Sequence, residues 1–177
     1  MSLVLRALTR DDFGLLATWL REPLVAEWWH DDPEPEAIER QYGPAVDGRE
    51  PTELRVGVLD GEPVGFVQWY RLADEPAYVA ELARILPVPP DAWSIDYLIG
   101  SAEHRRRGTG TALVRAALAE IGPAPVVVPV HADNRASVAL LRRVGFTVVA
   151  EGELEPDNPA HSRAHVVLLR NAADRPG

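Results

Sequence analysis

A glycine-rich turn between an apolar segment and a helical pattern constrains the fold of this chain most. Residues 93–99 read as a strand and residues 109–121 as a helix. The turn between them carries three arginines, 105–107, and two glycines, Gly108 and Gly110. Such a turn suits an anion, because the first turn of a helix leaves backbone N–H groups unpaired and the helix dipole favours negative charge there. The pattern predicts a phosphate-binding loop in an α/β protein.

The two best-known nucleotide loops have a different form. The P-loop ends in Gly-Lys-Ser/Thr, and the dinucleotide loop reads Gly-x-Gly-x-x-Gly. Neither sequence occurs at residues 105–111, where a plain basic turn is the alternative interpretation. The flanking sequence decides between the two interpretations.

A second patterned segment follows the loop. Asn134 suits a helix N-cap, residues 135–144 carry an apolar stripe, and Gly145-Phe146 suits a helix end. These rules explain the helix itself but not its pairing with the loop. Together, in this order, the two segments resemble the signature motifs of the GCN5-related N-acetyltransferases (GNAT).

The resemblance covers nearly the whole chain and implies one α/β domain over residues 1–177, a GNAT fold with a mixed central β-sheet flanked by helices. It implies acetyl-CoA as co-substrate. The positions that match its cofactor-binding residues are Tyr97, Leu98, Ile99, Arg105, Arg106, Arg107, Gly108, Thr109, Gly110, Thr111 and Asn134.

The rest of the pattern agrees with such a fold. Asp60-Gly61 predicts a two-residue hairpin turn. The expected strands are Ser2 to Ala7, Leu54 to Leu59, Pro63 to Arg71, 93–99, 126–131, 146–153 and 163–170. The expected helices are Arg10 to Glu22, capped by Thr9 or Asp11, then Pro35 to Tyr42, 109–121 and 135–144.

Composition excludes several classes of protein. The 177 residues are 46% hydrophobic and include no cysteine, so disulfides, thiolate metal sites and cysteine nucleophiles are excluded. No apolar run is long enough to span a membrane and no signal-peptide pattern begins the chain, so we expect a cytoplasmic protein. The histidines are scattered, which predicts no metal site, and no Gly-x-Ser-x-Gly elbow occurs.

Within the family, the chain is similar to the aminoglycoside 6'-N-acetyltransferases, enzymes of antibiotic resistance. The similarity lies in Glu27-Trp28-Trp29, Gln41-Tyr42, residues 60–68, Ile95-Asp96 and the loop. It implies a small-molecule amine substrate. The expected substrate contacts are Glu27, Trp28, Trp29, Gln68, Tyr70 and Asp96. For the tryptophans, one ring filling the core and the other covering it is the alternative.

Asp96 is the expected catalytic residue. It interrupts an apolar strand, where a charge costs free energy unless it is paired or functional. In the resembled enzymes the matching aspartate contacts the amine that is acetylated, so Asp96 is expected to hold the amine and take its proton. The alternative is a strand residue that faces solvent. The implied chemistry is direct transfer, with backbone N–H groups of Tyr97 to Ile99 polarising the thioester carbonyl.

Two positions depart from the resembled pattern. A tyrosine that serves as general acid is replaced by Leu141, and an Asp-Pro pair by Pro129-Val130. Tyr97 and His131 are the candidates to supply the missing acid. Acylation of another amine, such as a lysine-derived siderophore precursor or a protein amine, and a non-catalytic binder of acyl-CoA or an aminoglycoside therefore remain alternative functions.

Charge gives separate evidence on the partner. The net charge is −9, which argues against nucleic acid. An acidic rim would attract a polycationic substrate, and simple solvation is the alternative. The acids expected at the rim are Glu27, Asp31, Asp32, Glu34, Glu36, Asp74, Glu75 and Glu81. A monomer and a homodimer are both compatible with the sequence.

Overall fold

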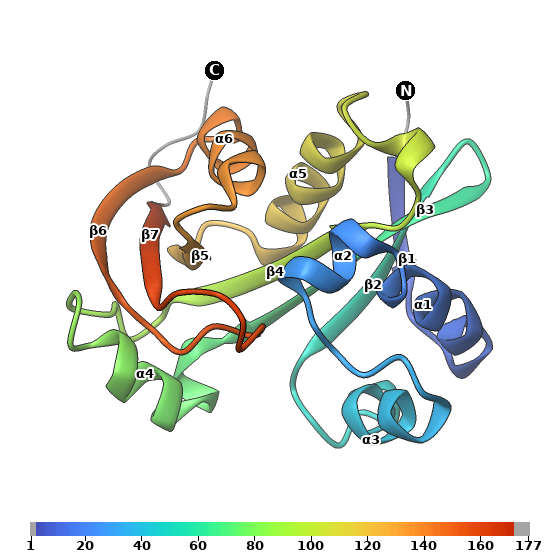
Figure 1. Ribbon diagram of the computed structural model, residues 1–177, viewed down its shortest axis with the longest axis horizontal. Coiled ribbons are helices and arrows are strands. Elements are labelled where there is room, and N and C mark those ends of the chain that lie inside the picture. Colours follow the sequence, from blue (N-terminus) through green and yellow to red (C-terminus); the bar gives the residue numbers. More distant parts are fainter. Residues whose placement is uncertain (1–2, 172–177) are drawn as a thin grey trace. The chain divides into compact units, whose positions relative to one another are not determined.

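Seven strands form one mixed sheet in the order β1-β2-β3-β4-β5-β7-β6 (Figure 1). The structure is a computed structural model and describes residues 3–171, so the predicted strand start at Ser2 lies outside the described residues. The strands are β1 Leu3–Ala7, β2 Glu53–Leu59, β3 Glu62–Arg71, β4 Trp93–Ile99, β5 Val126–His131, β6 Thr147–Glu153 and β7 Ala164–Arg170.

Strand pairing makes the sheet mixed. β1 with β2, β2 with β3, β5 with β7 and β6 with β7 are antiparallel pairs. β4 and β5 are parallel, and their register is defined by a single pair, Trp93 with Val126. The predicted α/β class with a mixed sheet flanked by helices is confirmed.

The hairpin between β2 and β3 turns where the sequence predicts. Asp60 and Gly61 both have positive φ, 52° and 89°. A two-residue turn with both central residues in this region matches the right-handed twist of the flanking strands, and Asp-Gly adopts it at low cost. The turn fixes the register of β3, the strand that carries Gln68.

Contacts divide the chain into two compact units. Among the described residues, the first contains 3–69 and 96–117 and the second contains 70–95 and 118–171. β3 and β4 each contribute residues to both units. Each unit is described below by itself.

In the first unit, one face of the sheet is covered by three helices, α1 Phe13–Leu20, α2 Pro23–Trp28 and α3 Pro35–Val46 (Figure 1). Their buried side chains share a core with Leu54, Val56, Phe66 and Leu98 of the strands. The helix α5 Thr109–Ile121 supplies Leu113, which lies against Gly57 and Gly65.

The N-terminal helix is shorter than predicted. A 3-10 turn, Arg10–Asp12, precedes α1, and the segment expected as one helix to Glu22 ends at Leu20. The Asp12 carboxylate accounts for the later start, because it accepts the Thr9 N–H at 2.9 Å and pairs with Arg6 at 2.7 Å. This fixes a tight turn ahead of the helix.

Proline explains the other helix differences. α2 and α4 Pro76–Leu82 were not predicted, and both begin with proline at the first helical position. Proline is favoured there because its missing N–H would have no partner. α3 runs four residues beyond the predicted Tyr42 and includes Pro44 in its last turn.

The second unit contains β5, β6, β7, α4 and the helix α6 Arg135–Arg143 (Figure 1). Its core joins Leu72, Leu82 and Ala92 to Val127, Leu154 and Val167. α6 ends one residue before the predicted 144, and β6 and β7 each begin one residue later than predicted.

Candidate active site

Asp96 and Gln68 face each other across β4 and β3. The Gly100 N–H, just after β4, donates to the Val64 carbonyl of β3 at 3.0 Å. Four residues back from Gly100 is Asp96, and four residues forward from Val64 is Gln68, so the two lie opposite each other. The Gln68 side-chain amide donates to Asp96 Oδ2 at 2.9 Å. Both side chains are half-buried. The strand residue is therefore a hydrogen-bonded carboxylate rather than one that only faces solvent.

The pair lies on the sheet face that α1, α2 and α3 cover. Side chains two residues apart on a strand share a face, so Gln68 shares its face with Phe66 and Asp96 shares its face with Leu98. Phe66 and Leu98 both belong to the core beneath the three helices. The carboxylate of Asp96 is thus the polar end of an apolar layer.

Two aromatic side chains pack on Phe66 from this helical layer. The Trp29 and Tyr42 rings lie 5.6 Å and 5.7 Å from the Phe66 ring, centroid to centroid, in edge contacts. Tyr42 is fully buried, while Trp29 is half-buried. The second tryptophan of Glu-Trp-Trp is therefore close to the sheet face that carries Asp96.

A carboxylate joins the two aromatic side chains. Asp31 Oδ2 accepts the Trp29 indole N–H at 2.9 Å and the Tyr42 hydroxyl at 2.5 Å, and the indole N–H also lies 3.1 Å from the Tyr42 oxygen. Burial, and then the charge of Asp31, raise the pKa of Tyr42 far above its usual range, with a smaller contribution from Asp96. Tyr42 therefore stays a neutral donor, and both carboxylates act on it.

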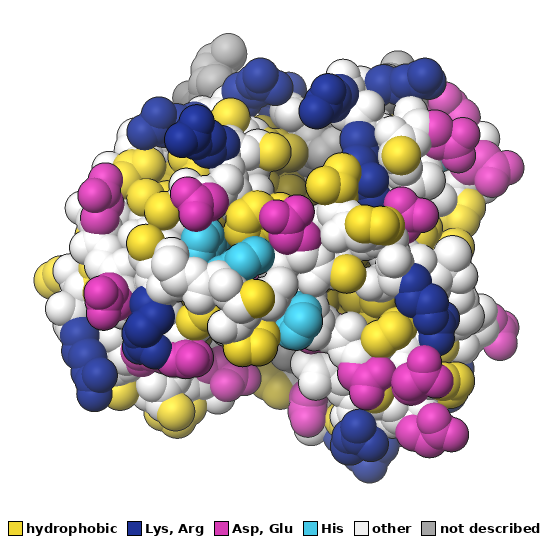
Figure 2. All heavy atoms as spheres, viewed as in Figure 1, with side chains coloured by type: hydrophobic (Ala, Val, Ile, Leu, Met, Phe, Trp, Pro, Cys, Tyr) yellow, Lys and Arg dark blue, Asp and Glu magenta, His cyan; other side chains and the backbone are white. Residues whose placement is uncertain are grey.

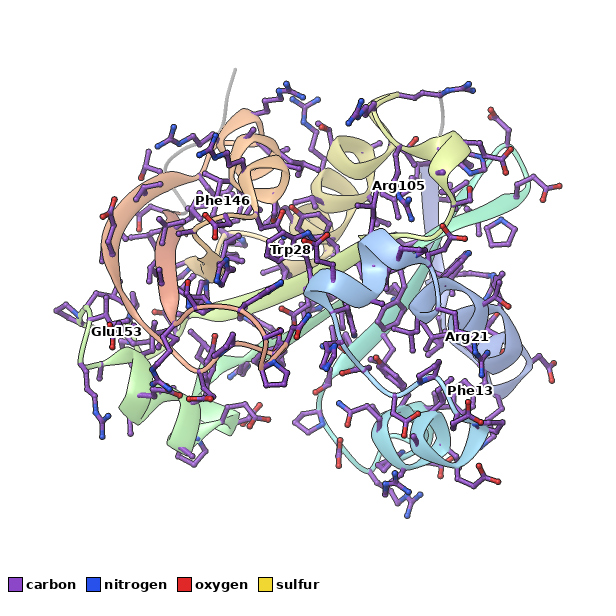
Figure 3. The ribbon with its side chains drawn as sticks, viewed as in Figure 1. Phe13, Arg21, Trp28, Arg105, Phe146 and Glu153 are labelled. Atoms are coloured by element: carbon purple, nitrogen blue, oxygen red, sulfur yellow. The ribbon has the colours of Figure 1, made fainter. Side chains whose placement is uncertain are left out.

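The other expected substrate contacts are Glu27 and Trp28, which lie on α2, and Tyr70, which lies on β3. Glu27 is exposed and Trp28 is half-buried near the end of α2 (Figure 3). Tyr70 lies two residues beyond Gln68 on β3 but packs against the core of the second unit. Gln68 and Asp96 are joined by a hydrogen bond, and Trp29 packs on Phe66, which shares their sheet face.

The loop before α5 has the backbone of an anion-binding turn. Arg106 and Gly108 both have positive φ, 60° and 83°, and a Cβ added at Gly108 would meet no atom within 4 Å. Arg106 and Arg107 are exposed. The loop thus presents two arginines and an open glycine backbone ahead of a 13-residue helix.

Arg105 differs from its two neighbours. Its guanidinium donates to the Ile99 carbonyl at 3.2 Å and lies 3.6 Å from the Glu22 carboxylate, with its side chain 19% exposed. Figure 3 shows it beside the start of α2. Arg105 thereby ties the end of β4 to Glu22.

Thr109 opens α5 with an unusual side chain. It is 1% exposed, and its hydroxyl oxygen has no hydrogen-bond partner among the described residues. A buried hydroxyl without a partner costs free energy, so a ligand atom that met it would recover that cost. Gly110 and Thr111, the last residues of the predicted loop, are half-buried in the first turn of α5.

The remaining predicted cofactor residues have defined surroundings. Leu98 is buried in the core, while Tyr97 and Ile99 are half-buried and alternate with it on β4. In the second unit, Asn134 caps α6, and its side-chain oxygen accepts the Ser137 N–H at 3.2 Å. The N-cap expected from sequence is thus present.

The two departures from the family pattern are also visible in the second unit. Leu141 is fully buried in α6, so no hydroxyl is available there. Pro129 and Val130 lie within β5. His131 ends that strand with its Nδ1 accepting the Asp133 N–H at 3.2 Å and its Nε2 3.0 Å from the Ser162 carbonyl oxygen.

Three histidines that the sequence scatters are in fact neighbours. The His131 ring lies 5.0 Å from the His161 ring and 5.4 Å from the His165 ring, centroid to centroid. Burial is the main cause that lowers the pKa of His165. Within residues 3–171, no group of three or more histidine, aspartate or glutamate side chains is arranged to hold a metal.

The expected acidic rim is uneven. Figure 2 shows acidic side chains gathered over the region of α3. Asp32 and Glu34, which precede α3, and Glu36, in its first turn, are exposed. Asp31 is engaged with Trp29 and Tyr42. In the second unit Asp74 and Glu75 are exposed, but Glu81 accepts the Glu155 N–H at 3.1 Å and lies 3.9 Å from Arg163.

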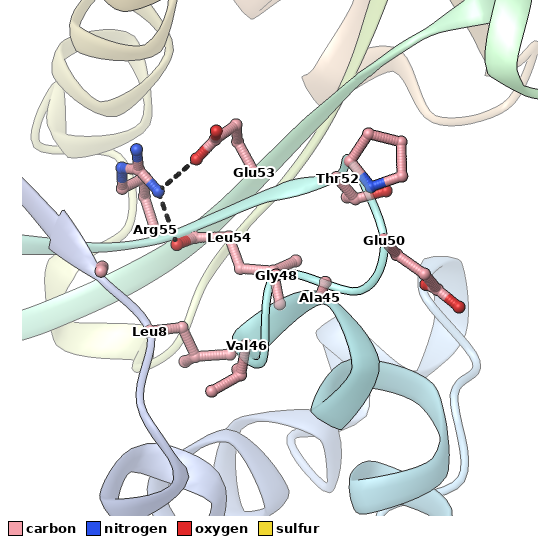
Figure 4. A pocket seen from close by; sticks show the side chains of 11 residues that line it. Leu8, Ala45, Val46, Gly48, Glu50, Thr52, Glu53, Leu54 and Arg55 are labelled. Atoms are coloured by element: carbon pink, nitrogen blue, oxygen red, sulfur yellow. Dashed lines mark hydrogen bonds and ion pairs between the residues drawn. The ribbon is translucent and has the colours of Figure 1, made fainter.

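A hollow of about 420 Å³ lies elsewhere in the first unit (Figure 4). It is bounded by the end of β1, the end of α3 and the start of β2, where Arg55 pairs with Glu53 at 2.7 Å. None of the predicted site residues lines it.

No helix among the described residues is long and apolar enough to cross a membrane.

The sheet order, together with the strand–loop–helix segment that carries the candidate site, defines the acetyltransferase class of α/β enzymes. A family model described as an acetyltransferase (GNAT) domain matches residues 9–154, which include Gln68, Asp96 and Asn134. This chain belongs to the GNAT family of acetyltransferases.

Two curated relatives are aminoglycoside N(6')-acetyltransferases type 1, from Klebsiella pneumoniae and from Serratia marcescens. Each is 29% identical over 183 residues, which cover 98% of this chain and 86% of the relative. A solved structure of AAC(6')-Ib in complex with paromomycin and acetyl-CoA has a TM-score of 0.80 and 24% identity, covering 99% of this chain and 97% of the other. This chain and that structure therefore share the same fold.

Sequence reasoning overlooked the link through Asp31. Tyr42 and Asp31 both appear in the sequence analysis, one as part of Gln41-Tyr42 and the other as a rim acid, but their contact joins α3 to the segment that precedes it. The one signal in the sequence is Tyr42 itself: a tyrosine on the buried side of a predicted helix needs a hydrogen-bond partner for its hydroxyl.

Proposed function

We propose that this chain transfers the acetyl group of acetyl-CoA to a primary amine of an aminoglycoside, as a 6'-N-acetyltransferase. The observation that carries the proposal is the half-buried Asp96 carboxylate, oriented by Gln68 on the strand that leads into the loop. The names of the two curated relatives support the substrate class.

The loop fits the phosphates of acetyl-CoA. Arg106, Arg107 and the backbone at Gly108 are open to a ligand, and the Thr109 hydroxyl is buried without a partner at the start of α5. Such groups suit a pyrophosphate at a helix N-terminus. Acetyl-CoA, when bound, supplies the acetyl group as a reactive thioester with a stable thiolate leaving group.

Asp96 prepares the amine. A primary amine is protonated at neutral pH and cannot attack in that form. The carboxylate holds the ammonium group and accepts its proton, directly or through one water. The Gln68 amide, which donates to Oδ2, holds the carboxylate in one orientation for this role.

The acceptor is held by Trp29, with Glu27, Trp28 and Tyr70 as further contacts, and the backbone N–H groups of Tyr97 to Ile99 polarise the thioester carbonyl. Leu141 supplies no general acid. Both ring nitrogens of His131 already have backbone partners, which disfavours His131 as the replacement. Tyr97 is the remaining candidate, and departure of an unprotonated thiolate is the alternative.

We further propose that the protein acts in the cytoplasm as a single domain, either as a monomer or as a homodimer, on a small molecule rather than on nucleic acid or a membrane. The net charge of −9 supports a cationic small molecule.

Release of free CoA from acetyl-CoA tests the proposal, with the purified chain and a panel of aminoglycosides, polyamines, lysine derivatives and peptides. We expect turnover with aminoglycosides and a product acetylated at the 6'-amine by mass and NMR. Turnover restricted to another amine would reassign the substrate. Binding of acetyl-CoA without turnover on any amine would identify a non-catalytic binder.

A further inference from the structure

Asp31 is a charged residue that lies between two aromatic side chains of the helical layer. It is half-buried in the segment between α2 and α3, and a single oxygen, Oδ2, meets both the Trp29 indole N–H and the Tyr42 hydroxyl. Placing a carboxylate between two aromatic side chains costs solvation free energy, which the two hydrogen bonds to Trp29 and Tyr42 offset.

The hydrogen bonds restrict how the Trp29 ring can turn. The ring meets Phe66 edge-on at an interplanar angle of 64°, and the indole N–H is held by Asp31 at one end. Phe66 shares its strand face with Gln68, the partner of Asp96. Whatever fixes Trp29 therefore fixes an aromatic surface on the face where the candidate catalytic carboxylate lies.

We propose that Asp31 is a positioning residue for the acceptor amine: through the Trp29 indole it holds one wall of the acceptor site in place relative to Asp96. The inference rests on the proposed function, because Trp29 is taken as a substrate contact. The buried Tyr42 hydroxyl donates to the Asp31 carboxylate and thereby orients it.

Three variants separate positioning from charge. Asp31→Ala removes the acceptor of both hydrogen bonds, whereas Asp31→Asn keeps an oxygen acceptor and loses the charge. Glu50→Gln is the matched control, because it removes one acidic charge from an exposed position just after α3 that belongs neither to the expected rim nor to the site. Kinetics are measured with acetyl-CoA and the aminoglycoside kanamycin.

With Asp31→Ala we expect KM for the amine to rise about tenfold, as for the loss of a hydrogen bond to a charged group. KM for acetyl-CoA stays within twofold of the parent value, and Asp31→Asn recovers most of the loss. Glu50→Gln changes KM for the amine less than twofold. An unchanged KM for the amine in Asp31→Ala, with only a lower melting temperature, would overturn the inference.

A second measurement does not depend on turnover. The Trp29 indole N–H signal is assigned in ¹H–¹⁵N NMR spectra with a Trp29→Phe variant, and kanamycin is then added to the parent and to Asp31→Ala. We expect the signal to shift in the parent and the Kd to rise about tenfold in the variant. A signal that ignores kanamycin in the parent overturns the inference. A shift that depends on Asp31 without any turnover supports it and refutes the proposed activity instead.

Discussion

The side-chain amide of Gln68 and the carboxylate of Asp96 form a hydrogen bond of 2.9 Å between neighbouring strands. It restricts the orientation of the Asp96 carboxylate on its strand. The geometry therefore separates the group that orients from the group that accepts a proton, which allows each to be changed alone.

Asp96→Asn should lower kcat by about 100-fold or more, because a positioned general base contributes that order of magnitude. Asparagine has the same shape, so affinity for CoA and the melting temperature should stay close to the parent values. Steady-state CoA release and calorimetric titration with CoA measure the two effects. A kcat within threefold of the parent would remove Asp96 from the chemistry.

Gly108→Ala should raise KM for acetyl-CoA, because φ is +83° and the backbone lies open in the loop. The same substitution at Gly122, where φ is +79° and the space is also open, is the matched control. Each change should lower the free energy of unfolding by about 1 kcal/mol from left-handed strain. Only the loop variant should alter the KM; equal kinetics in both would refute the loop assignment.

Gly100→Ala should destabilise the fold by about 1 to 3 kcal/mol through overpacking. A Cβ there would lie 2.1 Å from Nε1 of the buried Trp19 ring. Gly14→Ala, in an exposed part of α1 with no atom within 4 Å, should instead add about 0.5 to 1 kcal/mol through helix propensity. Urea unfolding of both variants checks the opposite signs, and a neutral Gly100 variant would contradict the packing described here.

Asp12→Asn should reduce stability at neutral pH. Hydrogen bonds from Arg6 lower the pKa of Asp12 below its ordinary 3.8, so this contribution is complete above that value and is lost as the pH falls through the folded-state pKa. Solvent screening of the partly exposed Arg6 keeps it near 1 kcal/mol. Unfolding of parent and variant from pH 7 to pH 2 should show a difference that closes in acid; a constant difference would contradict this.

Local patterns predicted the parts of the fold that depend on neighbours in sequence. The strand 93–99, the helix 109–121 and the Asp60-Gly61 turn have the predicted bounds, because period and turn chemistry are local properties. α2 and α4 were not predicted, because helices of six and seven residues are too short to show a clear helical period. The domain boundaries and the site assignments stay predictions.

For the candidate site, sequence found the residues but not their partners. Asp96 and Gln68 were both named, yet their contact follows from the register of two strands. The Asp31–Tyr42 contact joins the segment between α2 and α3 to α3 itself. The gathering of His131 with His161 and His165 arises from the pairing of β5 with β7. Contacts of this kind depend on tertiary packing that no local pattern encodes.

The contacts of Arg105 change how the loop's electrostatics should be counted. Three adjacent arginines suggest a trivalent cationic patch, but one guanidinium faces the Ile99 carbonyl and Glu22. The ligand-facing valence is therefore two, from Arg106 and Arg107. The affinity for CoA should therefore fall with added salt as expected for two cationic side chains rather than three. Removing the charge of Arg105 should change the position of the loop more than its attraction for phosphate.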